Sequence, residues 1–474
     1  MQVKFGTDGA RAPFSNDLTA ESGLITPESG FRIGAAAVEA LGINRFVMVQ
    51  DTRTFNPELA AAIKEGIASR GGVTADLGIL PTPAAAFVAD HLTTNTEREY
   101  GAFSITASHN KATDAGIKVF GKGGNKLDDE VTGNLQHIAN TLSLPGTGSH
   151  TFDQSGRLFN NDALRQLYIE IALKSVSRDV GRDFLRGKDI VVDAANGAAF
   201  WSAPEILRRL GANVTLINGD PLAEINKDCG ATHTGPMQQI VRDTGAHYGG
   251  ALDGDADRLE AFQIANGFER VLDGEDALVI EHRYQKELGL LVDNAEVITT
   301  DYATTGFERE MRRRGVKTIF VGNGDRYVHE RLNNSKSAFA GAEKSGHILL
   351  KRVAKAQKMI LSGDGTIAMV QQLQAEVVLG KRLTQVSSFD RLGYARADIV
   401  VALGTNAIAV VAHECVSRVI SAGQDMVGPD GMVMVRGSGT EPIIRVLAKT
   451  GEDQSLVDAI VEELEVAVQE VTNG

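Results

Sequence analysis

Three alternations of strand, helix and strand constrain the fold of this chain more than any other feature of its sequence. The first has an apolar run at residues 46–50 (FVMVQ), followed at residues 56–72 by a helical segment with Asn at its start, Pro in its first turn and Gly at its end. Similar alternations occupy residues 189–217 and 296–322. Strands that alternate with helices form βαβ units, so we expect three α/β domains with mixed or parallel sheets.

The last hundred residues follow another pattern. Strand-like stretches within residues 427–435 and 443–450 precede a terminal amphipathic helix, whose apolar face carries Leu456, Ile460, Val461, Leu464 and Val468. This pattern predicts a smaller α+β domain. We expect domain limits at residues 1–155, 156–259, 260–378 and 379–474, with a surface connection at residues 142–150 (LSLPGTGSH).

The length and net charge of the chain limit the number of domains and the kinds of partner to expect. A chain of 474 residues exceeds one hydrophobic core and predicts ~3 to 4 domains. The net charge of -13 argues against a nucleic-acid partner. The chain has no apolar run near the ~18 residues of a membrane span and no signal segment, so we expect no membrane partner and a cytoplasmic location. Cys229 and Cys415 are expected to be reduced thiols.

An acidic loop, LDGDADR, offers a metal site. Asp253, Asp255 and Asp257 alternate with small residues, so their oxygens can converge on one hard divalent cation, for which Mg²⁺ is the natural choice. An EF-hand fails because its sixth and twelfth positions hold Arg258 and Ile264. A phosphatase with an aspartate nucleophile is disfavoured by the third aspartate, and a solvated acidic turn is the remaining alternative.

Two further stretches present single reactive side chains. Ser108 lies in SITASHN, in a turn that follows a strand, where it is either a nucleophile or part of a surface turn. Arg11 lies in FGTDGARA, where it could reach a phosphoryl group or belong to a tight turn. Either assignment depends on the other motifs that accompany it.

The segment EKSGH can contact a sugar. If it is extended, Glu343 and Ser345 project to one side and offer an acceptor and a hydroxyl to neighbouring sugar hydroxyls. His347 is a candidate for proton transfer, although a histidine is more often a hydrogen-bonded structural residue. Lys344 adds a cation to which the sequence gives no role.

A glycine-rich segment, RGSGTEPIIR, offers an anion site. Its glycines allow backbone N–H groups to approach an anion, and its hydroxyls and two arginines add donors; the alternative is a hairpin turn. The candidate ligands are Arg436, Ser438, Gly439, Thr440 and Arg445. Together with Lys118, Arg258 and Arg11, these cations could attract a dianion to an acidic protein. A nucleophile, a divalent ion, a second phosphate site and a sugar contact together indicate phosphoryl transfer on a sugar.

These motifs resemble one family. In order along the chain, FGTDGAR, TASHN, GIKVF, DGDADR, EKSGH and RGSGTEPIIRV are similar to the motifs of the α-D-phosphohexomutase superfamily, and the likeness covers essentially the whole chain. Within it, GIKVFGKGGNKLDDEV, VDAANGA, INKDCGATH and GDRYV resemble bacterial phosphoglucosamine mutases. The resemblance implies three related α/β domains and a smaller C-terminal domain around a central cleft.

The resemblance also implies a reaction and a set of residues. Glucosamine 6-phosphate and glucosamine 1-phosphate would interconvert through a phosphoserine enzyme and a 1,6-bisphosphate, supplying UDP-N-acetylglucosamine and cell-wall synthesis. Homodimers are compatible with it. The implied roles are phosphoserine and metal ligand for Ser108; Mg²⁺ ligands for Asp253, Asp255 and Asp257; acid/base work for Lys118 and His347; contact with the transferred group for Arg11 and Arg258; sugar binding for Glu343 and Ser345; and phosphate binding for Arg436, Ser438, Gly439, Thr440 and Arg445.

Four departures leave the sugar open. GTDGARA replaces GTDGIRG, Lys111 replaces a proline, Lys344 replaces the usual Gln, and residues 301–306 (DYATTG) differ from the usual sugar-facing loop. A phosphomannomutase/phosphoglucomutase with the same mechanism is therefore the first alternative. A non-catalytic sugar-phosphate binding protein is the second, although such a protein would need no nucleophile and metal together.

Overall fold

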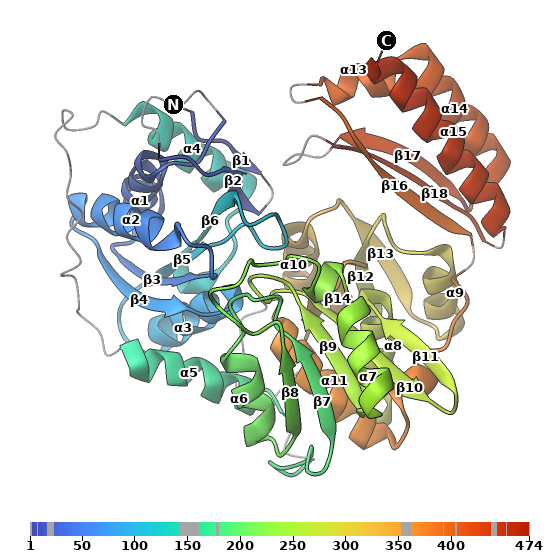
Figure 1. Cartoon of the computed structure of the whole chain (residues 1–474), viewed down its shortest axis with the longest axis horizontal. Coiled ribbons are helices and arrows are strands. Elements are labelled where there is room, and N and C mark those ends of the chain that lie inside the picture. Colours follow the sequence, from blue (N-terminus) through green and yellow to red (C-terminus); the bar gives the residue numbers. More distant parts are fainter. Residues whose placement is uncertain are drawn as a thin grey trace. The chain divides into compact units, whose positions relative to one another are not determined.

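The computed structural model (Figure 1) describes residues 2–6, 8–16, 23–142, 161–176, 180–351, 362–391, 393–402, 405–437, 443–451 and 453–473. It divides into two compact units, one made of Met1–Val292 with Gly324–Ser387 and the other of Asp293–Asn323 with Ser388–Gly474. Of the predicted connection at residues 142–150, only Leu142 lies within the described residues.

The first sheet has six strands in the order β1-β2-β6-β5-β3-β4. Its centre is parallel, because β3 pairs in parallel with both β4 and β5, whereas β6 runs antiparallel to β5 and β2. The apolar run and the helix expected after it are confirmed as β3 and α2. The bounds are β1 (Phe5–Gly6), β2 (Gly9–Pro13), β3 (Arg45–Gln50), β4 (Val73–Ile79), β5 (Gly101–Ile105) and β6 (Asp114–Phe120), with helices α1 (Pro27–Leu41), α2 (Asn56–Ser69), α3 (Thr82–Asn95) and α4 (Asp129–Thr141), and the short turn η1 (Lys122–Gly124).

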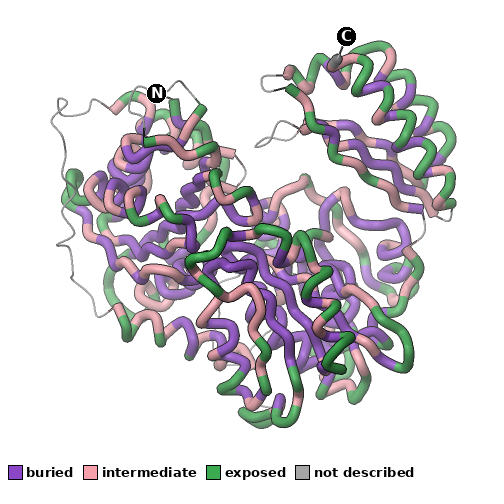
Figure 2. The backbone as a smooth tube through the Cα atoms, viewed as in Figure 1, coloured by how far each residue is buried: buried purple, intermediate pink, exposed green. Residues whose placement is uncertain are grey.

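Helices cover this sheet and seal its core. Side chains of α1, α2 and α4 pack on Phe46, Met48 and Phe103 of the sheet in one apolar cluster. Figure 2 shows buried residues following the strands of each sheet, while exposed residues lie mainly on helices and connecting loops. The sheet therefore forms a rigid support for the loops at its ends.

The second sheet has five strands in the order β11-β10-β9-β7-β8. Strand β7 pairs in parallel with β8 and β9, whereas β9, β10 and β11 follow one another antiparallel. The strand, helix and strand expected between residues 189 and 217 are confirmed. The bounds are β7 (Asp189–Asp193), β8 (Asn213–Ile217), β9 (Tyr248–Leu252), β10 (Leu259–Ala265) and β11 (Phe268–Leu272), with α5 (Asn161–Lys174), α6 (Ser202–Arg209), η2 (Gly230–Thr232) and α7 (Gly235–Thr244).

The third α/β segment divides between the two compact units. Its strand–helix–strand pattern is confirmed in the second unit as β12 (Glu296–Thr300), α9 (Thr305–Arg313) and β13 (Lys317–Val321), and β12 and β13 are parallel. The remainder lies in the first unit, where β14 and β15 pair antiparallel. These elements are α8 (Gly274–Glu287), α10 (Asp325–Asn334), β14 (Ala338–Ala342), β15 (Ile348–Leu350), α11 (Gly365–Leu379) and α12 (Leu383–Val386).

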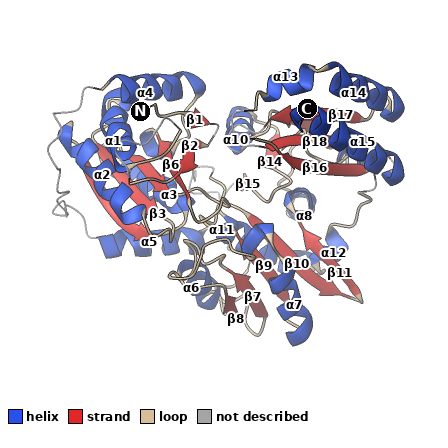
Figure 3. Cartoon of the chain, turned by 45° about the horizontal axis from the view of Figure 1, so that its top comes forward, coloured by secondary structure: helices blue, strands red, loops and turns tan. Residues whose placement is uncertain are grey.

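The C-terminal segment is the smaller α+β domain that the sequence predicts. Its antiparallel sheet has the order β16-β18-β17, and helices pack on one face of the sheet (Figure 3). The predicted apolar face of the last helix is confirmed, because Ile460, Leu464 and Val468 lie in that core. The bounds are β16 (Tyr394–Val400), α13 (Ala407–Ala412), α14 (Glu414–Val427), β17 (Met432–Gly437), β18 (Ile443–Lys449) and α15 (Gln454–Asn473). Across the described residues, every helix is too short or too polar to cross a membrane.

Candidate active site

Ser108 lies in a turn just beyond β5, with its hydroxyl held against an aspartate. Its Oγ donates a hydrogen bond to Asp253 Oδ2 at 2.7 Å, and its backbone N–H donates to Thr106 Oγ1 at 2.8 Å. The residue has φ 54°, in the left-handed region that non-glycine residues rarely occupy. Such strain costs ~1–3 kcal/mol and persists where the surroundings enforce it, often at functional sites.

Two side chains from other segments enforce this conformation. Arg53 Nη2 donates to the carbonyl oxygens of Ser108 (3.3 Å) and Asn110 (3.0 Å). Asn226 Nδ2 donates to the same two oxygens at 2.8 and 3.0 Å. Arg53 is itself paired with Asp51 at 3.1 Å, and both side chains are 0% exposed. These hydrogen bonds to its carbonyl oxygens hold the turn in place. The sequence motifs assigned no role to Arg53 or Asn226.

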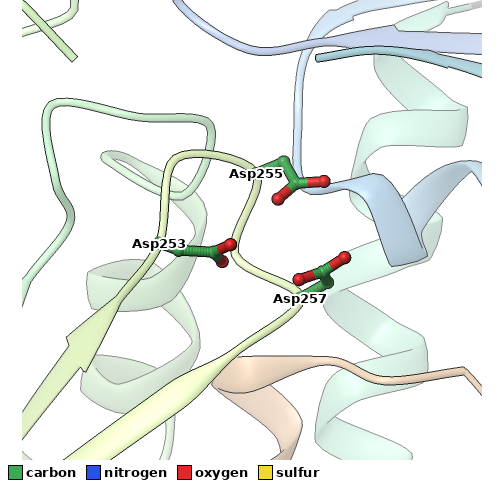
Figure 4. A group of neighbouring side chains, drawn as sticks. All are labelled: Asp253, Asp255 and Asp257. Carbon is green, nitrogen blue, oxygen red and sulfur yellow. The ribbon is translucent and has the colours of Figure 1, made fainter. Parts of the chain in front are cut away.

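The three aspartates lie on the loop that joins the antiparallel strands β9 and β10. Figure 4 shows Asp253, Asp255 and Asp257 pointing toward one another, and one ligand oxygen from each lies within 4.8 Å of the others. All three are buried. Asp255 Oδ1 and Asp257 Oδ1 have no hydrogen-bond partner among the described residues. Buried oxygens without partners fit the ligands of a hard metal ion.

The pKa shifts of the aspartates are also consistent with a metal site in this loop. Burial, and then repulsion from Asp257 and Asp255, raise the pKa of Asp253 well above its usual range. Burial also acts to raise the pKa of Asp257, but Lys118, His347 and other nearby groups outweigh it and hold that pKa well below its usual value. A bound divalent cation would relieve the repulsion that Asp253 experiences.

Lys118 extends from β6 into the same cluster. Its Nζ lies 2.8 Å from Asp255 Oδ2, 2.8 Å from Asp257 Oδ2 and 2.9 Å from Asp8 Oδ2. Burial lowers the pKa of Lys118, but these three carboxylates outweigh it and raise that pKa well above its usual range. The side chain is therefore held as an ammonium group beside the aspartate loop.

Asp8 connects the N-terminal loop to this cluster. Arg11 Nη2 lies 2.6 Å from Asp8 Oδ2, and Lys126 Nζ lies 3.1 Å from Asp8 Oδ1 and also pairs with Asp325. Burial acts to raise the pKa of Asp8, but Lys118, Lys126 and Arg11 outweigh it and keep that pKa well below its usual range. The sequence placed Arg11 near the site but assigned no role to Asp8, Lys126 or Asp325.

His347 and Arg258 close the cluster on the side of the third α/β segment. His347 Nε2 lies 3.3 Å from Asp325 Oδ2, and its Nδ1 lies 3.7 Å from Asp257 Oδ1. Burial lowers the pKa of His347, but Asp325 and Asp257 outweigh it and raise that pKa. Arg258 Nε lies 4.0 Å from Asp253 and 3.9 Å from Asp257. The structure thus brings both predicted residues to the aspartate loop.

The candidate sugar contacts lie on the turn between β14 and β15. Glu343 is half-buried, its Oε1 accepts the Gly324 N–H at 3.1 Å, and burial raises its pKa despite Arg258. Ser345 is exposed. Lys344 pairs with Asp273, the N-cap of α8, at 3.0 Å. The cation that the sequence left without a role therefore contacts a helix cap.

The predicted phosphate site lies in the second compact unit. Arg436 on β17 and Arg445 on β18 are directly opposite one another in the sheet. Arg436 Nε donates to the Tyr302 hydroxyl at 2.8 Å. The other three candidate ligands, Ser438, Gly439 and Thr440, lie outside the described residues.

Family models match four consecutive segments of the chain. They are the phosphoglucomutase/phosphomannomutase alpha/beta/alpha domains I, II and III, over residues 2–145, 166–264 and 273–390, and the C-terminal domain over residues 390–466. The chain belongs to the phosphoglucomutase/phosphomannomutase family. The family resemblance expected from the motifs is thereby confirmed.

Relatives in this family cover the chain almost completely. The phosphoglucosamine mutase of Desulforudis audaxviator is 34% identical and covers 99% of both chains, and that of Paramagnetospirillum magneticum is 36% identical over 97% of this chain and 96% of its own. A solved structure of Aspergillus fumigatus N-acetylphosphoglucosamine mutase, in complex with GlcNAc-6P and magnesium, has a TM-score of 0.67 with 16% identity. It covers 100% of this chain and 96% of its own. At that identity the likeness concerns the phosphoglucomutase/phosphomannomutase fold alone.

Proposed function

We propose that the chain is an isomerase of the cytoplasm that interconverts glucosamine 6-phosphate and glucosamine 1-phosphate. Its full-length curated relatives carry the name of that activity. One observation of the site carries the proposal: the Ser108 hydroxyl lies 2.7 Å from Asp253, within a buried group of three aspartates that fits a metal ion. A strained, buried serine beside such a group is suited to accept and return a phosphoryl group.

In the proposed reaction, Ser108 begins as a phosphoserine. The bond between phosphorus and Ser108 Oγ breaks while a bond from phosphorus to the sugar O1 forms, giving a 1,6-bisphosphate. The bisphosphate then turns so that its 6-phosphoryl group faces Ser108. The bond between that phosphorus and the sugar O6 breaks while a bond to Ser108 Oγ re-forms, and O6 regains a proton, which leaves glucosamine 1-phosphate.

Two groups of the cluster are candidates for proton transfer. His347, held between Asp257 and Asp325, is suited to take the proton from the attacking sugar hydroxyl and return it later. Lys118, the other acid/base candidate, is held as an ammonium by three carboxylates, so it is better suited to balance negative charge than to give up its proton. Arg11 and Arg258 supply further positive charge around the transferred group.

The metal is proposed to be Mg²⁺. Asp253, Asp255 and Asp257 would hold it together with an oxygen of phosphorylated Ser108. The buried Oδ1 atoms of Asp255 and Asp257, which accept no hydrogen bond from the part of the chain that the structure describes, support this set. When bound, the ion neutralises negative charge on the transferring phosphoryl group.

Substrate recognition is proposed to use the remaining candidates. Glu343 and Ser345 would contact sugar hydroxyls, and the phosphate that does not react would be bound by the segment 436–445, namely Arg436, Ser438, Gly439, Thr440 and Arg445. Lys344 and residues 301–306 are the features that favour the alternative, a phosphomannomutase/phosphoglucomutase. The pairing of Lys344 with Asp273 accounts for the first of these without any change in the sugar.

The test is phosphorylation and turnover of Ser108→Ala, with Ser421→Ala as the matched control. Ser421 is exposed on α14 in the other compact unit. Wild type and Ser421→Ala should convert glucosamine 6-phosphate and yield a phosphorylated peptide containing Ser108 by mass spectrometry. Ser108→Ala should lose both the phosphopeptide and turnover while unfolding at the same temperature. Normal turnover by Ser108→Ala would rule out the phosphoserine mechanism.

A further inference from the structure

The three-stranded C-terminal sheet has one apolar face and one face on which charged residues lie among apolar ones. Side chains alternate along a strand, and directly opposite residues on paired strands share a face. Val433 and Val435 of β17 face the core formed with α14 and α15. Arg436, the next residue after Val435, therefore points to the other face. Arg445, which is directly opposite Arg436, and Asp398, which is directly opposite Arg445, share that face. The charged residues on this other face are Arg396, Asp398, Arg436, Arg445 and Lys449.

Tyr302 contacts two of these arginines at once. The guanidinium carbons of Arg436 and Arg396 lie 5.0 and 5.1 Å from the centre of its ring, and its hydroxyl accepts the hydrogen bond from Arg436 Nε. Stacking and a directional bond together fix the plane of the Arg436 guanidinium. The bond engages Nε, whereas the two Nη groups form one of the edges with which a guanidinium grips a phosphate.

Asp398 lies between Arg396 and Arg445, as Tyr302 lies between Arg396 and Arg436. One of its oxygens lies 2.7 Å from Arg396 Nη2, and the same oxygen lies 3.6 Å from Arg445 Nε. Asp398 is also directly opposite Arg445, and Arg445 is directly opposite Arg436. The carboxylate thus connects Arg396 to Arg445, as Tyr302 connects Arg396 to Arg436.

Lys449 fixes the backbone that carries Tyr302. Its Nζ donates to the carbonyl oxygens of Asp301 (2.7 Å) and Ala303 (2.9 Å), on either side of Tyr302. Lys449 is only 5% exposed, and its Nζ lies 5.1 Å from the centre of the Phe320 ring. A buried lysine that binds two carbonyls in this way holds the Tyr302 loop against the charged face.

We propose that Tyr302 and Asp398 are positioning residues that hold Arg436 and Arg445 in place for the non-reacting phosphate of the substrate. Arg396 contacts both Tyr302 and Asp398 and so connects the two positioning residues. The inference rests on the proposed function, which assigns a phosphate to the two arginines. Arg396, Arg436 and Arg445 together with Asp398 carry two net positive charges. Lys449, the fourth cation of this face, donates to the carbonyl oxygens of Asp301 and Ala303. A phosphate monoester carries nearly two negative charges at pH 7, so the net charge of the three arginines and Asp398 matches it.

Tyr302 lies within residues 301–306, the stretch whose sequence leaves the sugar open. The hydrogen bond that its hydroxyl accepts from Arg436 connects this stretch to the proposed phosphate site.

The test compares three variants in the full-length protein. Tyr302→Phe removes the hydroxyl and keeps the ring on which both arginines stack. Arg436→Gln removes the guanidinium group that is proposed to bind the phosphate. Arg418→Gln is the charge-matched control, because Arg418 is exposed on α14, which packs on the opposite face of the same sheet. Each protein is titrated with inorganic phosphate by calorimetry, and its kcat and KM for glucosamine 6-phosphate are measured.

We expect Tyr302→Phe to weaken phosphate binding and raise KM about fivefold, and Arg436→Gln to do so by about tenfold or more, because hydrogen bonds to charged groups are strong. For Tyr302→Phe, kcat should stay within about twofold, since the contact is alike in ground and transition states. Arg418→Gln should match wild type in both assays.

Three results separate the possibilities. If Tyr302→Phe binds phosphate as tightly as Arg418→Gln does, while Arg436→Gln binds it more weakly, the positioning role alone is overturned. Equal phosphate affinity in all variants would overturn both that role and the phosphate site. Weakened phosphate binding in a protein that does not turn over glucosamine 6-phosphate would support the positioning role and reject the proposed function.

Discussion

Replacing Gly254 with alanine tests how closely the serine turn and the metal loop approach one another. An alanine Cβ would lie 2.6 Å from the Ser108 carbonyl oxygen, 2.8 Å from Ile225 Cδ1 and 2.9 Å from Asn226 Nδ2. Ordinary contacts begin at 3.4 Å, so the loop and the turn must separate by about 0.8 Å. A displacement near 1 Å can cost ~100-fold in rate, and overpacking costs ~1–3 kcal/mol of stability.

We therefore expect Gly254→Ala to fold and to lose between ~10- and ~100-fold in kcat/KM for glucosamine 6-phosphate. The matched control is Gly235→Ala at the start of α7, where an added Cβ meets nothing within 4 Å. The control should keep wild-type turnover and change stability by less than ~1 kcal/mol. Equal kcat/KM in the two variants would refute the argument that this close approach sets the geometry of Ser108.

Two further substitutions test individual contacts. Arg53→Ala leaves the buried Asp51 carboxylate without its cationic partner, while Asn56 still donates to it, so the free energy of unfolding in urea should fall by ~3–5 kcal/mol. Lys64→Ala, which breaks a pair whose side chains are 30% and 27% exposed, should cost ~1 kcal/mol or less, and an equal loss in both would contradict the assigned burial. Lys344→Gln should leave the kcat/KM ratio of glucosamine 6-phosphate to glucose 6-phosphate within twofold, because Lys344 contacts a helix cap; a tenfold change would show that it selects the sugar.

Local patterns in the sequence predicted most of the elements that support the site. The apolar run at β3 and the capping signals of α2 are short-range features, and both elements form as expected. The antiparallel pairings of β6 with β5 and of β9 with β10 were not predicted, because pairing direction depends on where distant strands lie. These two pairings matter, since they carry Lys118 and the aspartate loop.

The charged partners of the site show the limit of local signals. Asp8, Lys126 and Asp325 lie more than a hundred residues apart in sequence, yet Lys126 pairs with both carboxylates. Their sequence signal was their place within the stretches FGTDGAR, GGNK and GDRYV, which indicated the family but no pairing. In the same way, strand alternation places Arg436 and Arg445 on one face, whereas only the fold brings Tyr302 to Arg436.

The most direct test of the proposed function is the substrate preference of the phosphorylated, Mg²⁺-loaded protein. Coupled assays would give kcat/KM for glucosamine 6-phosphate, glucose 6-phosphate and mannose 6-phosphate under identical conditions. We predict a kcat/KM for the amino sugar at least about tenfold above those for both neutral sugars, which corresponds to ~1.4 kcal/mol of transition-state discrimination. Equal or higher values for a neutral sugar would contradict the assignment to glucosamine phosphate, and no turnover of any of the three would contradict mutase activity altogether.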